Sequence, residues 1–366
     1  MLNKSQPIRI AIAGLGFGES VHIPASIFNE NIDLLGLWHP RKERLREACA
    51  KHELYAYETW EDLINDPEVE GIIIATPPAP RYELALEAIK AGKHLLLEKP
   101  TCLNSDEVME LQRNALTRNL KIAVDFEYRA VPQFMQAKRI IQEKKLDEPY
   151  FVKLDWLMSS RANPERPWNW YSDENSGGGV LGALGTHAFD MIHWLIGPTY
   201  SLSAINSTSI KERFCPLSKT TKAVTSEDVS ISQLQIKSIH NNLIPVQVNL
   251  SAVTQQSKGF SLELYFNNGT LVLSSENQQD YVHGFGLWFS DNGEVLKNVQ
   301  PDSDLAFSKI WTDGRIAPVA RIQRWWAQSI IDGTPVIPGL VEGLASQKVA
   351  DKVKESNSTG MKQEID

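Results

Sequence analysis

Residues 8–19 read Ile-Arg-Ile-Ala-Ile-Ala-Gly-Leu-Gly-Phe-Gly-Glu, and this stretch decides the fold. Its first six residues are mostly β-branched or small, which predicts a short buried strand. Gly14 then permits a tight turn, Gly16 lets the backbone approach a pyrophosphate, and a helix follows. The stretch therefore predicts a dinucleotide site, with cofactor contacts from Gly14, Gly16, Phe17 and Gly18.

The glycine pattern of this turn is imperfect. The third glycine of the usual motif would fall at position 19, which is Glu19, and we expect Gly18 to take over its role with a slightly different helix approach. The alternative interpretation is a strand–helix turn that binds no ligand. The position of the turn between a strand and a helix favours the dinucleotide site.

Strand and helix patterns alternate through the first third of the chain. After the strand at 8–13, apolar runs predict five more strands, at 32–38, 55–57, 71–75, 94–97 and 121–125. Single helices between successive strands predict an α/β fold with a doubly wound parallel sheet of the Rossmann type, which we assign to residues 1–125. Ligands of such sheets bind beyond the carboxyl ends of the strands, so we expect functional residues after the first, second, fourth and fifth strands.

The pattern changes beyond residue 125. A helix is expected over 131–145, and alternating apolar residues at 246–252 and 260–266 predict strands with one buried face. Asn267-Asn268-Gly269 is a hairpin signal. We therefore predict a second domain over 126–366 that is built on a largely antiparallel sheet.

The end of the chain reads as helical and then polar. Closing helices are expected over 317–331 and 340–354, and these are candidates for packing back on the first domain. Residues 355–366 are polar, and we expect them to be frayed. Further upstream, Gly177-Gly178-Gly179 precedes a predicted helical run that ends at Leu195.

Composition bounds the class of protein. The 366 residues are 42% hydrophobic and 22% charged, with a net charge of −8, which excludes wholesale disorder and disfavours nucleic-acid binding. Three cysteines are too few for a disulfide framework and lack zinc spacing, so we expect no metal site and a reducing compartment. The polar residues 1–7 do not resemble an export signal, and no apolar run approaches the roughly 18–20 residues of a membrane span. These features predict a cytoplasmic protein without a membrane partner.

The second predicted strand ends in Trp38-His39-Pro40-Arg41-Lys42. A cofactor with a free ribose 2′-hydroxyl prefers an Asp or Glu at this point, and none is present. Arg41 and Lys42 can pair with a 2′-phosphate, so we predict cofactor contacts from His39, Arg41 and Lys42 and favour NADP(H) over NAD(H). The alternative is a solvated basic start of a helix.

An ionisable pair follows the fifth predicted strand, in the sequence Glu98-Lys99-Pro100. Charges directly after such an apolar strand need a reason, because burying a charge is costly. At the carboxyl edge of the sheet both side chains can face a cofactor, and Pro100 restricts the backbone of Lys99. Lys99 is therefore a candidate general acid or base, whereas the alternative is a surface ion pair.

The chain resembles the Gfo/Idh/MocA oxidoreductases, which include glucose–fructose oxidoreductase and inositol dehydrogenase. The resemblance covers nearly the whole chain and rests on motifs in the expected order: Gly14–Gly18, Ala75-Thr76-Pro77, Ala91-Gly92-Lys93-His94, Glu98-Lys99-Pro100 and Gly177–Asp190. It implies an N-terminal Rossmann domain and a C-terminal α/β domain with a large open sheet that mediates dimers or tetramers. It also implies a tightly held nicotinamide cofactor and hydride transfer at a carbinol or carbonyl carbon of a sugar, polyol or related molecule.

The resemblance assigns roles around the cofactor. It implies that Lys99 contacts the substrate and assists proton transfer. Glu98 would line the cofactor near the nicotinamide ribose, and Thr76 and Pro77 would lie along it.

The resemblance also assigns roles after the triple glycine. His187 matches the catalytic or substrate-orienting histidine, and Asp190 matches the last position of that signature. Helical spacing predicts that Ala183, His187 and Asp190 share one face. Ala183 stands where many members have an aspartate that binds the substrate, and Arg81 occupies a position often held by histidine. Either Lys99 and His187 suffice for catalysis, or the chemistry is weak or absent.

Residues after the first domain are candidates for substrate contact. Arg129 begins the second domain near the expected cleft, and Trp170 lies on a loop that also carries Arg161, Trp168, Asn169 and Tyr171. Aromatic rings with arginine and asparagine suit a sugar face, so we predict substrate contacts from Arg129, Trp170 and Asp190. The alternative is a loop packed on its own domain or on an oligomer interface.

These features predict an NADP(H)-dependent sugar or polyol oxidoreductase that acts on a small molecule as a homodimer or homotetramer. Lys99 would move the hydroxyl proton and His187 would orient the substrate oxygen. The alternative is a cofactor-binding regulator or scaffold, because the family includes a repressor of yeast galactose genes that works by protein contact. Ala183 keeps this alternative open, whereas the retention of Lys99 and His187 favours the enzyme.

Overall fold

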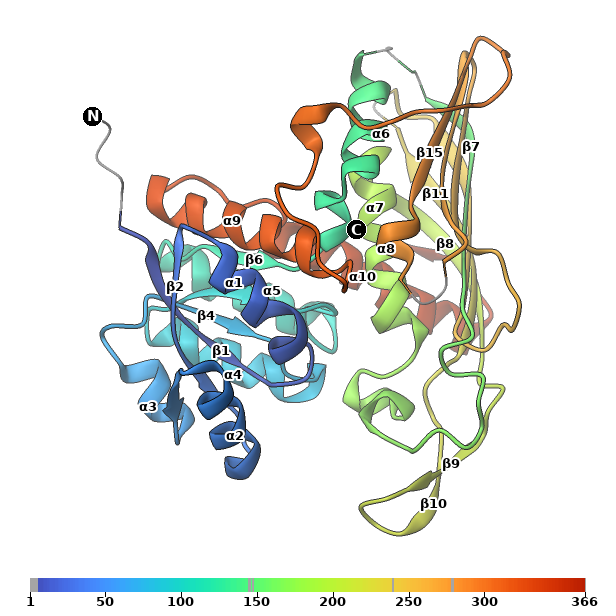
Figure 1. Ribbon diagram of the computed structural model, residues 1–366. Helices are drawn as coiled ribbons and strands as arrows, with labels where there is room; N and C mark the ends of the chain where they lie inside the picture. The colour runs from blue at the N-terminus through green and yellow to red at the C-terminus, as the bar shows by residue number, and fades with distance from the viewer. Residues whose placement is uncertain (1–5, 144–145, 147, 239, 278–279, 366) are drawn as a thin grey trace, which may run out of the picture. The chain divides into compact units, whose positions relative to one another are not determined.

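The computed structural model describes residues 6–143, 146, 148–238, 240–277 and 280–365 (Figure 1). Within these residues the chain forms two compact units. Unit 1 comprises residues 6–127 and 309–344, and unit 2 comprises residues 128–308 and 345–365. Most of the polar start of the chain, residues 1–5, and the last two positions of the helix predicted over 131–145 lie outside the described residues.

Unit 1 is built on a parallel sheet, which we call the Rossmann sheet. Its strands in the described residues run in the order β3-β2-β1-β4-β5-β6. They are β1 (Ile8–Ala13), β2 (Ile32–Trp38), β3 (Tyr55–Tyr57), β4 (Gly71–Ile74), β5 (His94–Leu97) and β6 (Ile122–Val124). Isoleucine and leucine fill β4 and β5, which are buried along nearly their whole length. The predicted doubly wound sheet is confirmed, and each predicted strand is found within one residue of its expected ends.

The helices of unit 1 connect these strands, apart from one that comes from much later in the chain. They are α1 (Ile23–Phe28), α2 (Lys42–His52), α3 (Trp60–Asn65), α4 (Pro78–Lys90), α5 (Ser105–Thr117) and α9 (Ile316–Asp332). The late helix α9 lies along α1, where Val319 packs against Val21 and Ala25 (Figure 1). Trp326 of α9 is fully buried over Gly71, where a Cβ atom would lie 2.9 Å from its ring.

Two of the predicted helices begin with a π turn instead of an α turn. Residues Gly18–His22 form the first, and the N–H of Ile23 donates to the carbonyl of Gly18. Pro24 follows at once and has no N–H to donate into an α-helical ladder, which explains the wider turn at this point. The second π turn, Leu181–Gly185, precedes α7 (Thr186–Leu195), so the run predicted as one helix changes its spacing before His187.

Unit 2 is built on a second sheet, which we call the mixed sheet. In the described residues its strand order is β16-β15-β14-β13-β7-β12-β11-β8-β17, with β7 and β12 parallel and the other neighbours antiparallel. The strands are β7 (Pro149–Leu157), β8 (Thr199–Ser207), β11 (Val229–Lys237), β12 (Leu243–Ser251), β13 (Gly259–Phe266), β14 (Gly269–Ser275), β15 (Gly286–Asp291), β16 (Lys297–Asn298) and β17 (Gln363–Glu364). The predicted hairpin is confirmed, because Phe266 pairs with Gly269 across Asn267 and Asn268.

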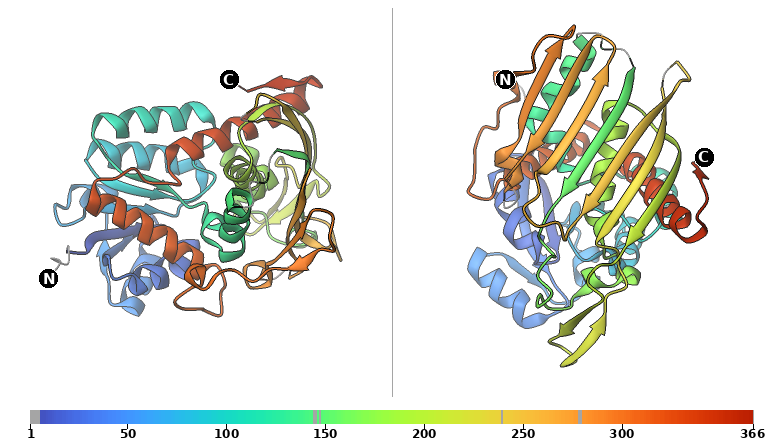
Figure 2. Two further views of the ribbon diagram at one scale, coloured as in Figure 1. Left: turned by 90° about the horizontal axis from the view of Figure 1, so that it is seen from above. Right: turned by 90° about the vertical axis from the view of Figure 1, so that its right-hand side faces the viewer.

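Helices cover one face of the mixed sheet. α6 (Pro132–Glu143), α7 and the later part of α10 (Leu340–Thr359) pack there against buried strand residues such as Leu154, Leu250 and Leu262. Figure 2 shows the opposite face, on which no helix of the described residues lies. A hairpin of β9 (Glu212–Cys215) and β10 (Thr220–Ala223) and the short helix α8 (Tyr281–Gly284) complete the unit.

The expectation that residues 355–366 are frayed was wrong. Helix α10 continues to Thr359, and β17 pairs with β8. Polar side chains account for this order, because Ser356 Oγ accepts a hydrogen bond from the N–H of Ala204 at 3.0 Å, and Asn357 Oδ1 accepts one from the N–H of Asn206 at 2.8 Å. These residues satisfy backbone groups on the edge of β8, so their polarity reflects pairing with a strand.

None of the helices of the described residues is long and apolar enough to cross a bilayer.

Candidate functional site

The turn after β1 packs directly on the loop after β4. Gly14 has φ +100°, and a Cβ atom there would lie 2.6 Å from the carbonyl oxygen of Ala75 and 2.9 Å from the nitrogen of Thr76. Only glycine fits this left-handed conformation and this close approach. The strand order of the Rossmann sheet reverses between β1 and β4, where open α/β sheets bind ligands. The structure therefore brings together Gly14 and Thr76, which we predicted separately as cofactor contacts.

The remaining glycines of the turn serve different purposes. A Cβ atom at Gly16 would meet nothing within 4 Å, so the space beside this backbone is open. A Cβ atom at Gly18 would lie 3.2 Å from Ile12 Cγ2, which is tighter than ordinary contact. Gly18 thus provides the close packing of helix on strand that the motif usually assigns to its third glycine. Open space at Gly16 fits a dinucleotide whose phosphates approach the backbone.

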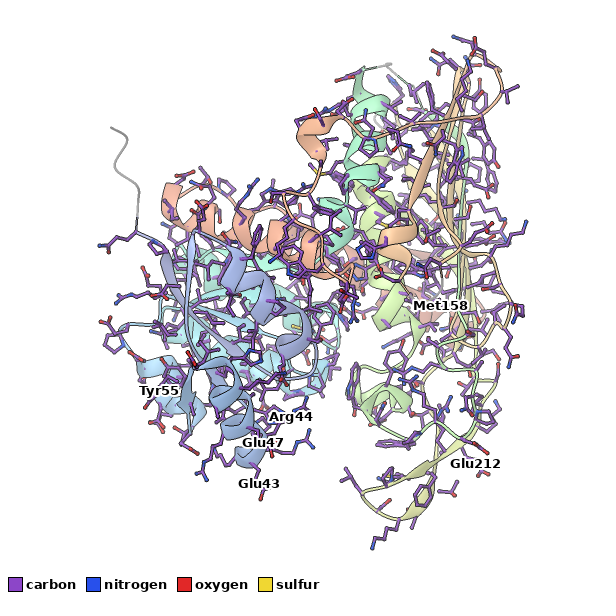
Figure 3. All side chains as sticks on the ribbon, in the orientation of Figure 1. Glu43, Arg44, Glu47, Tyr55, Met158 and Glu212 are labelled. Atoms are coloured by element: carbon purple, nitrogen blue, oxygen red, sulfur yellow. The ribbon has the colours of Figure 1, made fainter. Side chains whose placement is uncertain are left out.

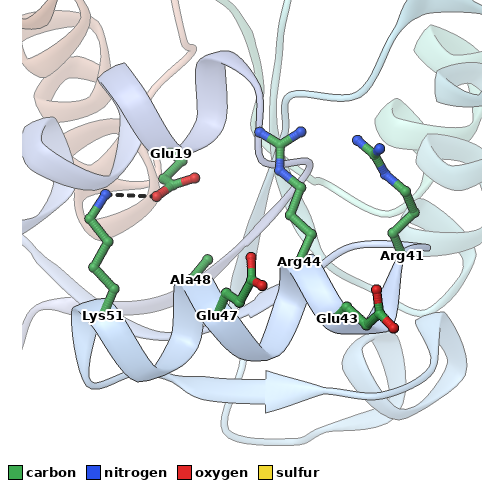
Figure 4. Close-up of a pocket in the computed structure, with 7 residues that line it drawn as sticks. All are labelled: Glu19, Arg41, Glu43, Arg44, Glu47, Ala48 and Lys51. Atoms are coloured by element: carbon green, nitrogen blue, oxygen red, sulfur yellow. Dashed lines mark hydrogen bonds and ion pairs between the residues drawn. The ribbon is translucent and has the colours of Figure 1, made fainter. Parts of the chain in front are cut away.

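A pocket of about 390 Å³ lies between this turn and α2 (Figure 4). Arg41 and Arg44 project into it from the start of α2, and Arg44 Nη2 donates to the carbonyl of Leu15 in the glycine turn at 2.6 Å. Across the pocket, Lys51 pairs with Glu19 at 2.9 Å. The other lining residues are Glu43, Glu47 and Ala48, and Figure 3 marks Glu43, Arg44 and Glu47 along α2.

The other predicted residues near β2 lie differently. Lys42 does not line the pocket, and its Nζ lies 3.9 Å from the Glu58 carboxylate. His39 Nδ1 accepts a hydrogen bond from the N–H of Arg41 at 3.0 Å, which shapes the turn into α2. Phe17 packs edge-on against His22 and lies under the guanidinium group of Arg315. The cofactor roles predicted for these three residues stay predictions.

Glu98 directly follows β5 and belongs to a buried hydrogen-bond network. His22 Nε2 lies 2.9 Å from Glu98 Oε1, and His22 Nδ1 lies 3.1 Å from Gln323 Nε2. Ser26 Oγ donates to Gln323 Oε1, so the amide nitrogen of Gln323 is the group that faces His22. The amide therefore donates to Nδ1, which leaves the proton of a neutral imidazole on Nε2 to be donated to Glu98.

Three carboxyl groups gather at the ends of β5 and β6. Burial opposes the ionisation of Glu98, yet the hydrogen bond from His22 and the charges of Lys99 and Arg81 outweigh it and lower its pKa to about 2. Burial, together with the charges of Glu98 and Glu127, raises the pKa of Asp125 well above its usual range. Burial also raises the pKa of Glu127 to about 7, against the opposing charge of Lys99. Lys99 therefore lies among three carboxyl groups in different protonation states.

The same groups have a spacing that a metal ion would fit. One ligand atom from each of His22, Glu98 and Asp125 lies within 4.8 Å of the others. Both imidazole nitrogens of His22 already have hydrogen-bond partners, and the raised pKa of Asp125 opposes the loss of its proton. Metal ligands must be deprotonated, so these observations favour a proton network. Our expectation of no metal site stays a prediction.

Arg81 lies in the first turns of α4 and is almost completely buried. Its guanidinium group donates to the backbone carbonyls of Thr76, Glu98 and Pro100. Of the other predicted contacts in unit 1, Pro77 is exposed at the start of α4, and Thr76 Oγ1 is buried without a hydrogen-bond partner among the described residues. An unsatisfied buried hydroxyl beside the glycine turn fits a polar ligand atom.

The predicted residues of unit 2 are buried and closely packed. Arg129 and Asp190 form a bidentate ion pair, with N···O distances of 2.8 and 2.7 Å. The ring of His187 is 2% exposed and lies edge-on to Tyr128, with the ring centroids 4.7 Å apart. Lys99 belongs to unit 1 and His187 to unit 2, so their cooperation is a proposal. The substrate contacts predicted for Arg129 and Asp190 stay predictions.

The loop before α7 is held by packing within unit 2. The guanidinium group of Arg161 lies 3.5 Å from the ring centre of Tyr171, and Trp168 Nε1 donates to the carbonyl of Ala223. Trp170 keeps 37% of its surface exposed. Gly179 of the triple glycine leaves room for the Glu227 side chain beside the π turn Leu181–Gly185. A Cβ atom at Gly179 would lie 2.2 Å from the Glu227 carboxylate. The structure thus shows this loop packed on its own unit, and the substrate contact predicted for Trp170 stays a prediction.

Several site residues were missed from the sequence, namely His22, Arg44, Asp125 and Glu127. Asp125 and Glu127 follow the sixth strand, and their place at the carboxyl end of a strand was the available signal. Arg44 lies one turn after Arg41 on α2, and helical spacing was the available signal. No sequence pattern reveals the pairing of His22 with Glu98, because a π turn and a residue of α9 determine it.

Two models of known protein families match the chain. Residues 8–126 match a family model described as an oxidoreductase family with an NAD-binding Rossmann fold. Residues 138–365 match the model described as the C-terminal alpha/beta domain of an oxidoreductase family.

Individual relatives agree with these matches. An uncharacterized oxidoreductase of Synechocystis sp. is 39% identical over 358 residues, which cover 97% of this chain and 95% of that protein. Levoglucosan dehydrogenase of Pseudarthrobacter phenanthrenivorans is 32% identical over 155 residues, which cover 42% of this chain and 40% of that protein. A structure of levoglucosan dehydrogenase in complex with NADH and levoglucosan has the same fold, with a TM-score of 0.87 at 20% identity, covering 98% of this chain and 100% of that one.

Glu127 predicts a pH dependence of stability. Because its pKa is about 7 in the folded protein and 4.5 ordinarily, the folded state keeps a proton that the unfolded state loses between these values. The contribution of Glu127 to the free energy of unfolding therefore falls by up to about 3 kcal/mol as pH rises from about 4.5 to 7. Urea denaturation of the wild type and Glu127→Gln at pH 5, 6, 7 and 8 should show the variant gaining relative stability with pH.

The control is Glu61→Gln on the exposed side of α3. It should displace the free energy of unfolding by a similar amount at all four pH values. Parallel pH curves for the wild type and Glu127→Gln would contradict the assignment of a perturbed Glu127.

Proposed function

Because the chain belongs to the Gfo/Idh/MocA oxidoreductase family, we propose that it transfers a hydride between a nicotinamide dinucleotide and a carbinol or carbonyl carbon of a sugar or polyol. The observation that carries the proposal is the position of Lys99, which follows β5 among buried carboxyl groups beside the loop on which the glycine turn packs. A relative named levoglucosan dehydrogenase supports a sugar derivative as substrate.

The residues of unit 1 suit a bound dinucleotide. When bound, the cofactor supplies the hydride donor or acceptor. Backbone N–H groups of the turn at Gly14–Gly18 hold the pyrophosphate, and Thr76 and Pro77 border the cofactor from the loop after β4. Glu98 is the proposed contact near the nicotinamide ribose, and the hydrogen bond from His22 helps to lower the pKa of its carboxyl group.

Lys99 and His187 are the proposed catalytic residues. Lys99 Nζ accepts the hydroxyl proton in the oxidative direction and returns it in the reductive direction. The carboxyl groups of Glu98 and Glu127 stabilise the ammonium form that results, because the charge of Lys99 helps to lower the pKa of Glu98 and opposes the rise in the pKa of Glu127. His187 orients the substrate oxygen, while Arg129, Asp190 and Trp170 are the proposed residues for substrate contact.

Removing the ammonium group of Lys99 should abolish most turnover and leave cofactor binding unchanged. General acid–base assistance is worth about 10²- to 10⁴-fold, so Lys99→Met should lower kcat by that factor. Nicotinamide absorbance followed with a panel of levoglucosan, myo-inositol, glucose and their keto or lactone forms measures the loss. Fluorescence titration with NADPH should show unchanged cofactor affinity.

Lys90→Met is the matched control, because Lys90 is exposed at the end of α4. It should keep wild-type turnover. Normal turnover by Lys99→Met would overturn the catalytic role of Lys99. Tight cofactor binding by the wild type with no turnover across the panel would favour the alternative of a cofactor-binding regulator, which Ala183 keeps open.

We also propose that the cofactor is NADP(H). Arg41 projects into the pocket beside the glycine turn, and no acidic residue ends β2 to accept a ribose 2′-hydroxyl. Arg44 lies beside it and is oriented by its hydrogen bond to the Leu15 carbonyl. The two guanidinium groups suit a 2′-phosphate, which they bind through charge-assisted hydrogen bonds.

Replacing Arg41 should weaken the binding of NADPH much more than the binding of NADH. A hydrogen bond to a charged group contributes about 1.5–3 kcal/mol, so Arg41→Ala should raise the Kd for NADPH by roughly 10- to 150-fold. The Kd for NADH should change less than about threefold, because NADH lacks the 2′-phosphate. Isothermal titration with each cofactor measures both values.

Arg46→Ala removes another exposed cation of α2, which pairs with Glu58 outside the pocket. This control should leave both dissociation constants near their wild-type values. Equal weakening of NADPH and NADH by Arg41→Ala would refute the proposed phosphate contact.

We further propose that the uncovered face of the mixed sheet binds a second copy of the chain. Exposed apolar side chains lie on four neighbouring or nearby strands of this sheet, namely Ile205, Ile231, Leu243 and Tyr265. Amide side chains such as Gln233 and Gln247 lie between them, and such groups can pair with their own kind across a twofold axis. A homodimer or homotetramer through this sheet is therefore our proposal for the assembly.

A charge on this face should break the assembly. Ile231 is 45% exposed, and Ile231→Lys should shift the mass measured by sedimentation equilibrium to a smaller species at micromolar concentration. Leu116→Lys changes another exposed apolar residue, on α5 in unit 1, and should leave the mass unchanged. A wild-type chain that sediments as a monomer would rule out the proposed interface.

A further inference from the structure

We propose that Arg81 is a positioning residue that holds Lys99 in place by binding the peptide groups on both sides of it. This inference rests on the proposed catalytic role of Lys99. It assigns a function to a buried residue whose guanidinium group binds the loops after β4 and β5.

The side chain of Arg81 donates hydrogen bonds to three backbone carbonyls in the loops that follow β4 and β5. Arg81 rises from the first turns of α4, and its guanidinium group donates to the carbonyl of Glu98 at 2.6 Å and to that of Pro100. The same group donates to the carbonyl of Thr76. Two of these bonds bracket Lys99 in the chain, and the third fixes the loop after β4. The segment that carries Lys99 is therefore tied to the loop that packs on the glycine turn.

The chemistry of these bonds distinguishes a positioning role from an ordinary buried ion pair. A buried guanidinium group is usually matched with a carboxylate, because its desolvation is costly. Here the nearby carboxylate of Glu98 is bound by His22, and the donors of Arg81 go to main-chain oxygens. Burial lowers the pKa of Arg81 to about 10, and the charge of Glu98 opposes this, so the group keeps its charge at neutral pH.

An arginine has a specific advantage at this position. Its planar fork offers several N–H donors in fixed directions, and the three carbonyls use that spread. A lysine has one nitrogen, and the histidine that the family resemblance places here offers at most two donors. Because a shift of about 1 Å at a reacting group can cost about 10²-fold in rate, fixing the backbone of Lys99 on both sides has a direct catalytic consequence.

The test uses Arg81→Lys, which keeps the charge and loses the fork. Stopped-flow absorbance of the nicotinamide is recorded with saturating NADPH or NADP⁺ and the panel sugar that the wild type turns over. We expect kcat to fall about 10- to 100-fold, with the KM for the cofactor within about threefold of the wild type. Arg113→Lys, an exposed substitution on α5, should leave both constants unchanged.

A double-mutant cycle separates positioning from a general structural effect. If Arg81 acts through Lys99, adding Arg81→Lys to Lys99→Met should lower the residual turnover by less than about threefold. An equal loss from Arg81→Lys in both backgrounds would show that Arg81 supports the fold in general and would overturn the proposal. Thermal unfolding by circular dichroism confirms that each variant is folded, and Arg81→Gln is the second substitution should the lysine variant not fold.

The outcomes also separate this inference from the function on which it rests. Normal turnover by Lys99→Met would overturn the catalytic role of Lys99 and the positioning role with it. A defective Lys99→Met combined with normal turnover in both Arg81 variants would overturn only the role of Arg81.

Discussion

The ionised carboxylate of Glu98 is the charge on which the organisation of unit 1 depends. Its burial at the end of β5 is unfavourable unless neighbours compensate for it. His22 compensates by donating a hydrogen bond, and Gln323 sets the orientation and tautomer of His22. Gln323 lies on α9, so a helix from the far end of the sequence completes a network at the end of β5. This dependence gives a physical reason for the return of residues 309–344 to the Rossmann sheet.

The neighbouring carboxyl groups adjust to that fixed charge. Asp125 cannot ionise readily beside an existing carboxylate in a water-poor environment, so it keeps its proton. Glu127 is further along the same chain segment and titrates near neutrality. The cluster behaves as one titrating system, in which the protonation of each member reflects the charges of the others. Lys99 and Arg81 supply the positive charge that balances it.

Local sequence patterns predicted most of the fold, whereas the roles of His22, Asp125 and Glu127 around Glu98 were missed. The strands of the Rossmann sheet, the hairpin at Asn268 and the glycine turn all depend on contacts between near neighbours in the sequence, which composition and spacing report directly. The π turn at Gly18–His22 was missed because its cause, Pro24, follows the turn and was not weighed. The role of Arg81 was missed because main-chain carbonyls, unlike side chains, leave no pattern in the sequence. The order of residues 355–359 was missed because their polar side chains pair with a strand that is distant in the sequence.

The two outermost strands of the mixed sheet, β16 and β17, are each only two residues long. A long exposed edge strand offers unpaired N–H and C=O groups to any other extended chain, and this is a common route to aggregation. Such short terminal strands leave little edge to extend, and β17 shields part of β8 in this way. Unit 2 is thus protected against the pairing of further strands at the edges of the mixed sheet.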